Sequence, residues 1–275
     1  MKLLAISDLH VGFPENRRAI ESMTPRPDDW LIVAGDLGET LDHVKFVADT
    51  LGPRFAKLIW VPGNHELWVD PLAPASEPRG EARYRMYVDF CQRSGIVCPE
   101  DPYVEWLGEG GPHLLVPMFL LYDYSFRPDH IPVENAIDWA AEDGIAAGDE
   151  VMLDPRPHSS RSAWCHQRVA LTEKRLSDSI DLPKVLINHF PLRQDIVLLP
   201  RVPRFSPWCG TRRTTDWHVR FRASTVVHGH LHVRRTCHVD GVRFVDVSLG
   251  YPRERRPGRA IDDYVRQILP IPETS

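Results

Sequence analysis

The sequence predicts an α/β fold in which parallel strands alternate with helices along the N-terminal half of the chain. Short apolar runs at residues 3–6, 30–34 and 58–61 are rich in Val, Ile and Leu, and a Ser, Gly or Pro follows each run, which favours buried strands. Stretches with helical spacing lie between these runs. Because each run is apolar at consecutive positions, both faces of the sheet are expected to be covered.

The predicted helices are those segments in which apolar side chains recur at helical spacing. Residues 40–51 carry such a stripe, with Thr40 as a suitable N-cap and Gly52 just beyond the end. The other stretches with helical character span residues 15–23, 81–93 and 161–180. Strand, helix, strand, helix, strand is the order of an α/β layer.

Further strands are expected in the second half of the chain. Two short apolar runs resemble the earlier strands, at residues 185–187 and 225–227. The dipeptide Asp240-Gly241 lies between residues 235–239 and 242–247 and is a strong hairpin signal. Open sheets of this kind bind ligands beyond the carboxyl ends of their strands, which directs attention to the residues that follow each run.

Composition excludes several classes of function. The formal net charge is −5, which argues against general nucleic-acid binding. The five cysteines include no CxxC pair and are odd in number, which is typical of reduced thiols in the cytoplasm. Asp8 interrupts the first apolar run after a few residues, so this run is too short for a signal peptide or a membrane span. We therefore expect a cytoplasmic protein without a membrane partner.

No linker divides the chain, so residues 1–275 are expected to form a single domain. Two stretches interrupt the simple alternation of strands and helices. Residues 70–100 begin with a proline-rich loop, and residues 128–160 combine prolines with a polar, glycine-containing sequence. We expect both stretches to be insertions or cap elements near the site.

Metal-seeking side chains follow all five apolar runs. Oxygen and imidazole ligands gathered at strand ends can hold metal ions, whereas one such group alone would mean little. The residues that follow the runs are, in chain order, Asp8 and His10, then Asp36, then Asn64 and His65, then His189, and finally His230 and His232, with His228 just before them.

Each group also has an ordinary structural interpretation. Asp8 and His10 are separated by one residue, so in an extended chain they project to the same side, but Asp and His are equally common in caps and turns. His230 and His232 repeat this spacing. Asp36 follows Gly35 and offers a carboxylate that can bridge two ions, although Gly-Asp alone is a common turn.

Asn64 and His65 lie in the order Gly-Asn-His-Glu, which is harder to explain as a turn alone. The Asn64 side chain offers a neutral carbonyl oxygen, and His65 can reach a substrate oxygen as an acid or a hydrogen-bond donor. His189 follows a strand, and only this position distinguishes it from a structural histidine.

The ordered set of motifs resembles the calcineurin-like metallophosphoesterase superfamily. The resemblance spans residues 8–232 and rests on Asp-Leu-His, Gly-Asp, Gly-Asn-His-Glu, Asn-His and Gly-His-Leu-His, in the order of the family. It implies a four-layer αββα sandwich of two mixed β-sheets flanked by helices. The chain from residue 185 onward, including the predicted hairpin, would build the second sheet.

The resemblance also implies a role for each ligand. One metal ion would be held by Asp8, His10, Asp36 and His232, and a second by the shared Asp36 with Asn64, His189 and His230. His65 corresponds to the histidine that assists the leaving group. Glu66 resembles the carboxylate that supports this histidine and is grouped with it as catalytic. His228 precedes the family motif and is expected to be a strand residue.

This ligand set implies two divalent or mixed-valence metal ions, with Mn, Fe and Zn all compatible. The reaction would be hydrolysis of a phosphate ester by attack of a metal-bridging hydroxide. A phosphodiester is the favoured substrate, and a phosphomonoester or a phosphorylated protein is the alternative. A catalytically silent metal-binding scaffold for other proteins is an alternative of another class, although the ligand set here is complete.

The residues that would contact the substrate are expected outside these motifs. Tyr124 and Arg127 follow an apolar run and are candidates to meet the organic part of a substrate, and Arg193 follows His189 closely enough to pair with phosphate. Core packing and a solvated surface role are the alternatives. Residues 122–126 and 208–211 also resemble a bacterial branch that includes phosphopantetheinyl hydrolases. That resemblance implies a carrier-protein partner, from which 4′-phosphopantetheine is removed.

Overall fold

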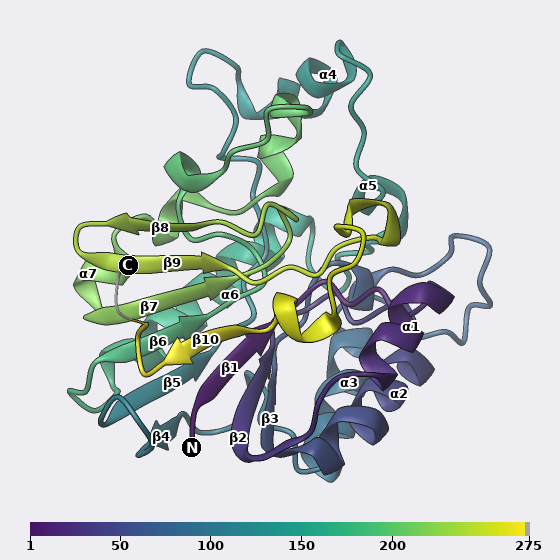
Figure 1. The fold of residues 1–275 in the computed structure, drawn as a ribbon. Helices are drawn as coiled ribbons and strands as arrows, with labels where there is room; N and C mark the ends of the chain where they lie inside the picture. The colour runs from purple at the N-terminus through teal and green to yellow at the C-terminus, as the bar shows by residue number, and fades with distance from the viewer. Residues whose placement is uncertain (273–275) are drawn as a thin grey trace.

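Two mixed β-sheets form the centre of the molecule in the computed structural model, which describes residues 1–272 (Figure 1). The first sheet has the order β10-β1-β2-β3. Its strands are β1 (Leu3–Ile6), β2 (Arg26–Val33), β3 (Phe55–Trp60) and β10 (Arg266–Leu269). The first three strands are parallel, and β10 pairs antiparallel with β1.

The second sheet has the order β4-β5-β6-β7-β9-β8. Its strands are β4 (Val104–Trp106), β5 (His113–Pro117), β6 (Lys184–Ile187), β7 (Ala223–His228), β8 (Thr236–Val239) and β9 (Val242–Asp246). Strands β5, β6, β7 and β9 are parallel, and the two edge strands are antiparallel to their neighbours. The predicted pair of mixed sheets is confirmed.

Helices flank the two sheets. Figure 1 shows α1, α2 and α3 gathered beside β1, β2 and β3. The helices are α1 (Pro14–Glu21), α2 (Leu41–Leu51), α3 (Gly80–Arg93), α4 (Ala136–Ala141), α5 (Asp149–Met152), α6 (Arg161–Ser177) and α7 (Trp217–Arg220). Short 3₁₀ turns span Gly52–Arg54, His65–Leu67, Val133–Asn135, Gln194–Ile196, Pro203–Trp208, Arg212–Thr214, Pro252–Glu254 and Ile261–Tyr264.

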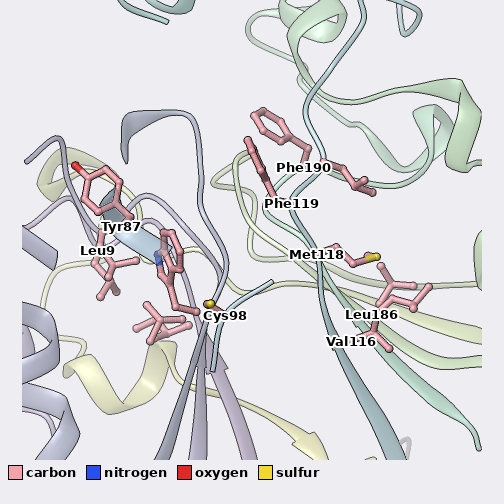
Figure 2. Close-up of a cluster of buried hydrophobic side chains, with 14 of the residues drawn as sticks. Leu9, Tyr87, Cys98, Val116, Met118, Phe119, Leu186 and Phe190 are labelled. Carbon is pink, nitrogen blue, oxygen red and sulfur yellow. The ribbon is translucent and has the colours of Figure 1, made fainter. Parts of the chain in front are cut away.

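The apolar runs are explained by burial on both faces of each strand. Along β1, Leu3 and Ala5 belong to the cluster between the two sheets, whereas Leu4 and Ile6 belong to the cluster beneath the helices. Figure 2 shows part of the second cluster, in which Tyr87 of α3 and Val116 of β5 are both buried. Both faces of the strands are therefore covered, as the consecutive apolar residues predict.

Most predicted elements are present with shifts of a few residues at their ends. The helix predicted at 40–51 begins at Leu41, because the Thr40 side chain accepts a hydrogen bond from the His43 backbone amide. The predicted hairpin joins β8 to β9, and Asp240 and Gly241 both have positive φ angles, 51° and 78°. The helix predicted at 161–180 ends earlier, at Ser177.

The strands β4, β5 and β10 and the short helices α4, α5 and α7 were not predicted from the sequence. Strand β10 comes from the C-terminal part of the chain and closes one edge of the first sheet, and β4 forms an edge of the second sheet. Both are short edge strands in which polar and apolar residues mix, so they lack the continuous apolar run of a central strand.

The two stretches expected to be insertions differ in their placement. Residues 70–100 contain α3, whose Tyr84 and Tyr87 are fully buried in the core beneath the helices. Residues 128–160 contain α4 and α5, and Figure 1 places α5 beyond the carboxyl ends of the strands. Throughout residues 1–272, the helices are too short or too polar to cross a membrane.

The core between the sheets predicts a specific effect on stability. Ile32 of β2 is fully buried in that core, so we expect Ile32→Ala to lower the free energy of unfolding by about 2–5 kcal/mol. Urea unfolding of the metal-free protein measures this change. Val151→Ala is the control, because Val151 is 68% exposed. Equal stability of the two variants would contradict the assigned packing.

Candidate metal centre

The strand-end residues singled out in the sequence converge on one place between the two sheets. Three strands of the first sheet and two of the second end there. Asp8 and His10 follow β1, Asp36 follows β2, Asn64 and His65 follow β3, His189 follows β6, and His230 and His232 follow β7. All are buried except His230 and His232, which are nearly so.

The carboxylate of Asp36 lies at the centre of this group. Its Oδ2 atom is 3.4 Å from His189 Nε2, 3.9 Å from His65 Nε2 and 4.0 Å from His10 Nε2. Only 2% of Asp36 is exposed. One carboxylate therefore faces imidazoles that come from both sheets, which is the arrangement expected of a ligand shared by two ions.

A second group of side chains surrounds Asp8. His232 Nε2 lies 3.0 Å from Asp8 Oδ1 and 3.4 Å from His10 Nε2. The side chains of Asp8, His10 and His232 each place a ligand atom within 4.8 Å of the others, as do those of Asp8, Asp36 and His189. These two sets of side chains share Asp8.

The donor atoms of this site fit metal ions. Asn64 Oδ1, His189 Nε2 and His230 Nε2 are buried, and within residues 1–272 none of these atoms has a hydrogen-bond partner. Buried polar atoms without partners are costly, and a bound cation would satisfy all of them. Mixed oxygen and imidazole ligands suit Mn, Fe or Zn.

Hydrogen bonds at the Nδ1 atoms of two candidate ligand histidines orient their rings. His232 Nδ1 is 2.7 Å from Glu254 Oε2, and His189 Nδ1 is 2.9 Å from the carbonyl oxygen of Ala34. In each case the other ring nitrogen, Nε2, is left to face the centre. Metal-binding histidines are usually oriented in this way. Glu254 was not predicted from the sequence, because it lies far along the chain in an ordinary polar segment.

The backbone at the ligands adopts the left-handed conformation. The φ angles are 54° at Asp8, 41° at His10, 55° at Asp36, 68° at His230 and 55° at His232. The expectation that an extended chain aligns each Asp/His or His/His pair is therefore wrong. The residues converge because the chain turns sharply after each strand, in a conformation that is unfavourable for non-glycine residues and that clusters at functional sites.

Glycines before these ligands leave room for them. Gly35 has a φ angle of 87°, and a Cβ atom there would lie 2.6 Å from His189 Nδ1. A Cβ atom at Gly63 would collide with the Asp36 carboxylate. The Gly-Asp and Gly-Asn-His motifs thus have a steric cause.

Burial and mutual attraction set the charges in the site. Burial by itself would raise the pKa of Asp8, yet the positive charge of His232 lowers it below its ordinary value. Burial opposes the ionisation of Asp36 in the same way, and His189 lowers its pKa. Burial lowers the pKa of His10 to about 3. The two carboxylates are thus held ionised, and a bound cation would take the place of the protons on the neighbouring imidazoles.

His65 lies at the edge of the centre. Its backbone amide donates to Asp36 Oδ1 at 3.0 Å, and its Nδ1 atom is 3.3 Å from Glu39 Oε1. Its ring lies against Trp68 with the ring centroids 3.7 Å apart, and its Nε2 atom is 3.4 Å from the Tyr251 hydroxyl. Nε2 is thus held toward the open side of the site.

A cavity of about 410 Å³ opens beside these residues. Asp36, Asn64 and His65 line it. The lining also includes an apolar group, Ala146, Ala147, Leu199, Val202, Phe205 and Leu231, and a second group of Tyr251, Arg253 and Glu254. Tyr251 and Glu254 were not among the sequence predictions, although the Tyr251 ring stacks on His10 with centroids 4.4 Å apart.

Comparison with known proteins agrees with this geometry. Residues 1–234 match the family described as calcineurin-like phosphoesterase. The chain belongs to the calcineurin-like phosphoesterase family. It is therefore a phosphoric ester hydrolase of a family that uses a dinuclear metal centre.

Two comparisons with a mycobacterial member of the family cover nearly the whole chain. The chain is 49% identical over 275 residues to the acyl-carrier-protein phosphodiesterase PptH of Mycobacterium tuberculosis, covering 98% of this chain and 84% of the relative. The crystal structure of phosphopantetheinyl hydrolase (PptH) from the same organism matches with a TM-score of 0.93 and 48% identity. That match covers 100% of this chain and 98% of the other.

Glu66 binds backbone amide groups beside the metal centre. Its carboxylate accepts hydrogen bonds from the backbone amides of Leu37 at 2.7 Å, Gly63 at 2.8 Å and Asp36 at 3.1 Å, and the residue is fully buried. These hydrogen bonds give Glu66 a supporting role in the loops, and its grouping with His65 as catalytic stays a prediction. In this phosphoesterase, Glu66 fixes the loops that follow β2 and β3.

The three residues predicted to bind substrate lie elsewhere. Tyr124 donates a hydrogen bond to Glu150 at 2.8 Å, and Arg127 donates to the carbonyl oxygen of Ile131 at 2.5 Å. Arg193 forms an ion pair with Asp195 at 2.7 Å. Within the part of the chain that the structure describes, none of the three lines the cavity beside the metal centre. Local partners therefore occupy the groups that were expected to meet substrate.

The three amide bonds of Glu66 give a testable consequence. Glu66→Gln places an amide nitrogen against at least one backbone N–H group, so we expect a loss of about 1–3 kcal/mol in the free energy of unfolding and weaker metal binding. Chemical unfolding and Mn²⁺ titration measure both quantities. Glu105→Gln is the control, because Glu105 is exposed on β4. Wild-type behaviour of Glu66→Gln would contradict the anchoring role.

Proposed function

We propose that this protein is a metal-dependent phosphodiesterase that removes 4′-phosphopantetheine from an acyl carrier protein. The observation that carries the proposal is the likeness to PptH along nearly the whole chain, which includes the segments around the cavity and not only the metal-binding motifs. A shared family alone would support only phosphoester hydrolysis.

The proposed ligands divide into two sets that share Asp36. Asp8, His10 and His232 complete one set, and Asn64, His189 and His230 complete the other. Mn, Fe or Zn ions in these positions would clamp the phosphate oxygens and acidify a water molecule for in-line attack. The partnerless buried atoms of Asn64, His189 and His230 support this assignment.

His65 is the proposed acid for the leaving oxygen. Glu39 accepts the proton on Nδ1, so the imidazolium form of His65 carries a second proton on Nε2, and this is the proton to be donated. The Tyr251 hydroxyl lies 3.4 Å from Nε2, where it can position the same oxygen. Release of 4′-phosphopantetheine requires the bond between phosphorus and the carrier-protein oxygen to break, so the leaving oxygen belongs to the carrier protein and takes up the proton.

The cavity lining suits the two parts of such a substrate. The group that includes Leu199, Val202 and Phe205 is apolar and can contact the carbon skeleton of the pantetheine arm. Arg253 also lines the cavity, is exposed and carries a charge suited to an anionic ester. We also propose a cytoplasmic location, because all five cysteines are free thiols.

The direct test uses a holo acyl carrier protein and the metal-loaded enzyme. We expect the intact mass of the carrier protein to fall by the mass of the prosthetic group and free 4′-phosphopantetheine to accumulate. Metal-free enzyme is the control. Persistence of the holo form, with enzyme that hydrolyses a small phosphodiester such as bis(p-nitrophenyl) phosphate, would contradict the proposed substrate but not the chemistry.

Substitution of the central residues separates metal binding from proton donation. Asp36→Ala should cost both ions, because both ligand sets share this carboxylate. His65→Ala should retain both ions and lose about 10²–10⁴-fold in turnover. Metal analysis of the purified variants beside activity measurements tests this, with His238→Ala as the control because His238 is exposed on β8. Full turnover by His65→Ala would exclude its assigned role.

A further inference from the structure

Asp149 is a buried acid that lines the cavity beside the metal centre. It is the first residue of α5 and only 2% exposed. One oxygen, Oδ1, accepts two hydrogen bonds, from Asn64 Nδ2 at 2.9 Å and from Trp68 Nε1 at 2.6 Å. The other oxygen, Oδ2, has no hydrogen-bond partner in the described chain. A single acceptor atom thus connects two side chains that follow β3.

The hydrogen bond from Asn64 to Asp149 decides which end of the Asn64 amide faces the metal centre. The amide nitrogen is held by Asp149, so the oxygen Oδ1 is left buried and without a partner among residues 1–272. If the amide turned over, its nitrogen would face the cation, and a donor group cannot serve as a metal ligand. An acceptor behind the amide therefore selects the orientation that binds metal.

The hydrogen bond from Trp68 to Asp149 supports the His65 ring through the indole that lies against it. The Trp68 indole donates its N–H to Asp149, and its ring lies against the His65 ring with centroids 3.7 Å apart and planes at 32°. An indole fixed by a hydrogen bond limits how far the imidazole can rotate. Asp149 therefore acts on both a proposed metal ligand and the proposed acid through these two hydrogen bonds.

Other contacts hold Asp149 in place. The Arg161 guanidinium donates to the carbonyl oxygens of Asp149 at 2.7 Å and Glu150 at 2.8 Å and pairs with the Glu150 carboxylate at 2.8 Å. The backbone amide of Val69 donates to the carbonyl oxygen of Met152 at 2.9 Å. The short helix is thereby fastened to α6 on one side and to the loop after β3 on the other.

We infer that Asp149 is a positioning residue that orients the Asn64 amide toward the second metal ion and holds Trp68 against His65. The segment at residues 128–160 would then complete the metal centre as well as line the cavity. This inference rests on the ligand sets of the proposed function and does not require a carrier-protein substrate.

Two substitutions at this position separate the acceptor from the charge. Asp149→Leu has a similar size but no acceptor, so we expect one Mn²⁺ ion to bind as in the wild type and the other to bind about 10–100-fold more weakly. Asp149→Asn keeps an oxygen that can accept from both donors, so it should bind both ions. Titration of the metal-free proteins with Mn²⁺, followed by the paramagnetic signal of the free ion, measures stoichiometry and affinity.

The controls distinguish positioning from a general loss of structure. Asp154→Asn changes an acid in the same segment whose side chain pairs with Arg156, and it should bind both ions normally. Thermal unfolding of the metal-free variants reports on the fold, and a purely structural role would lower the melting temperature without weakening one ion selectively. Wild-type affinity for both ions in Asp149→Leu would overturn the inference.

A second variant keeps the test decisive if Asp149→Leu does not fold. Trp68→Phe leaves the bond between Asp149 and Asn64 intact, so both ions should bind while hydrolysis of bis(p-nitrophenyl) phosphate slows. Unchanged turnover in Trp68→Phe would refute the support of His65. Failure of the wild-type protein to bind two Mn²⁺ ions would instead contradict the ligand sets of the proposed function.

Discussion

The buried carboxylate of Asp36 is the constraint on which the rest of the site depends. Removing an ionised carboxylate from water is expensive unless opposite charges and hydrogen bonds compensate for it. Here the Nε2 atoms of His10, His65 and His189 lie within 4.0 Å of it, and the His65 backbone amide donates to it. These groups come from both sheets, so the sheets have to end at the same point.

The scaffold stabilises a backbone that would be unfavourable alone. Asp8, His10 and Asp36 have positive φ angles directly beyond strands that are buried on both faces. Left-handed non-glycine residues persist only where surrounding contacts determine them. Glu66 supplies such contacts by binding the backbone of Asp36, Leu37 and Gly63. The buried strands and the hydrogen bonds of Glu66 therefore together hold the loops after the strands in their left-handed conformation.

The fold and the convergence of the candidate ligands were largely predictable, because both depend on local sequence signals. Central strands are continuous apolar runs, and their ends meet at one edge of a sheet, so ligands that follow them could be found without coordinates. Glu39, Tyr251, Glu254 and Asp149 carry no such signal, because they are ordinary residue types brought together only by tertiary packing. The sequence pattern did not reveal that the Arg193 side chain forms an ion pair with Asp195, two positions away.

The central claim is that Asp36 lies between two metal ions held by residues of both sheets. Anomalous diffraction from crystals of the Mn²⁺-loaded protein tests it most directly. We expect two peaks about 3.5–4 Å apart, with the Asp36 carboxylate bound to both ions, Asn64 to one and His10 to the other. A single peak, or two peaks that do not share Asp36, would contradict the claim.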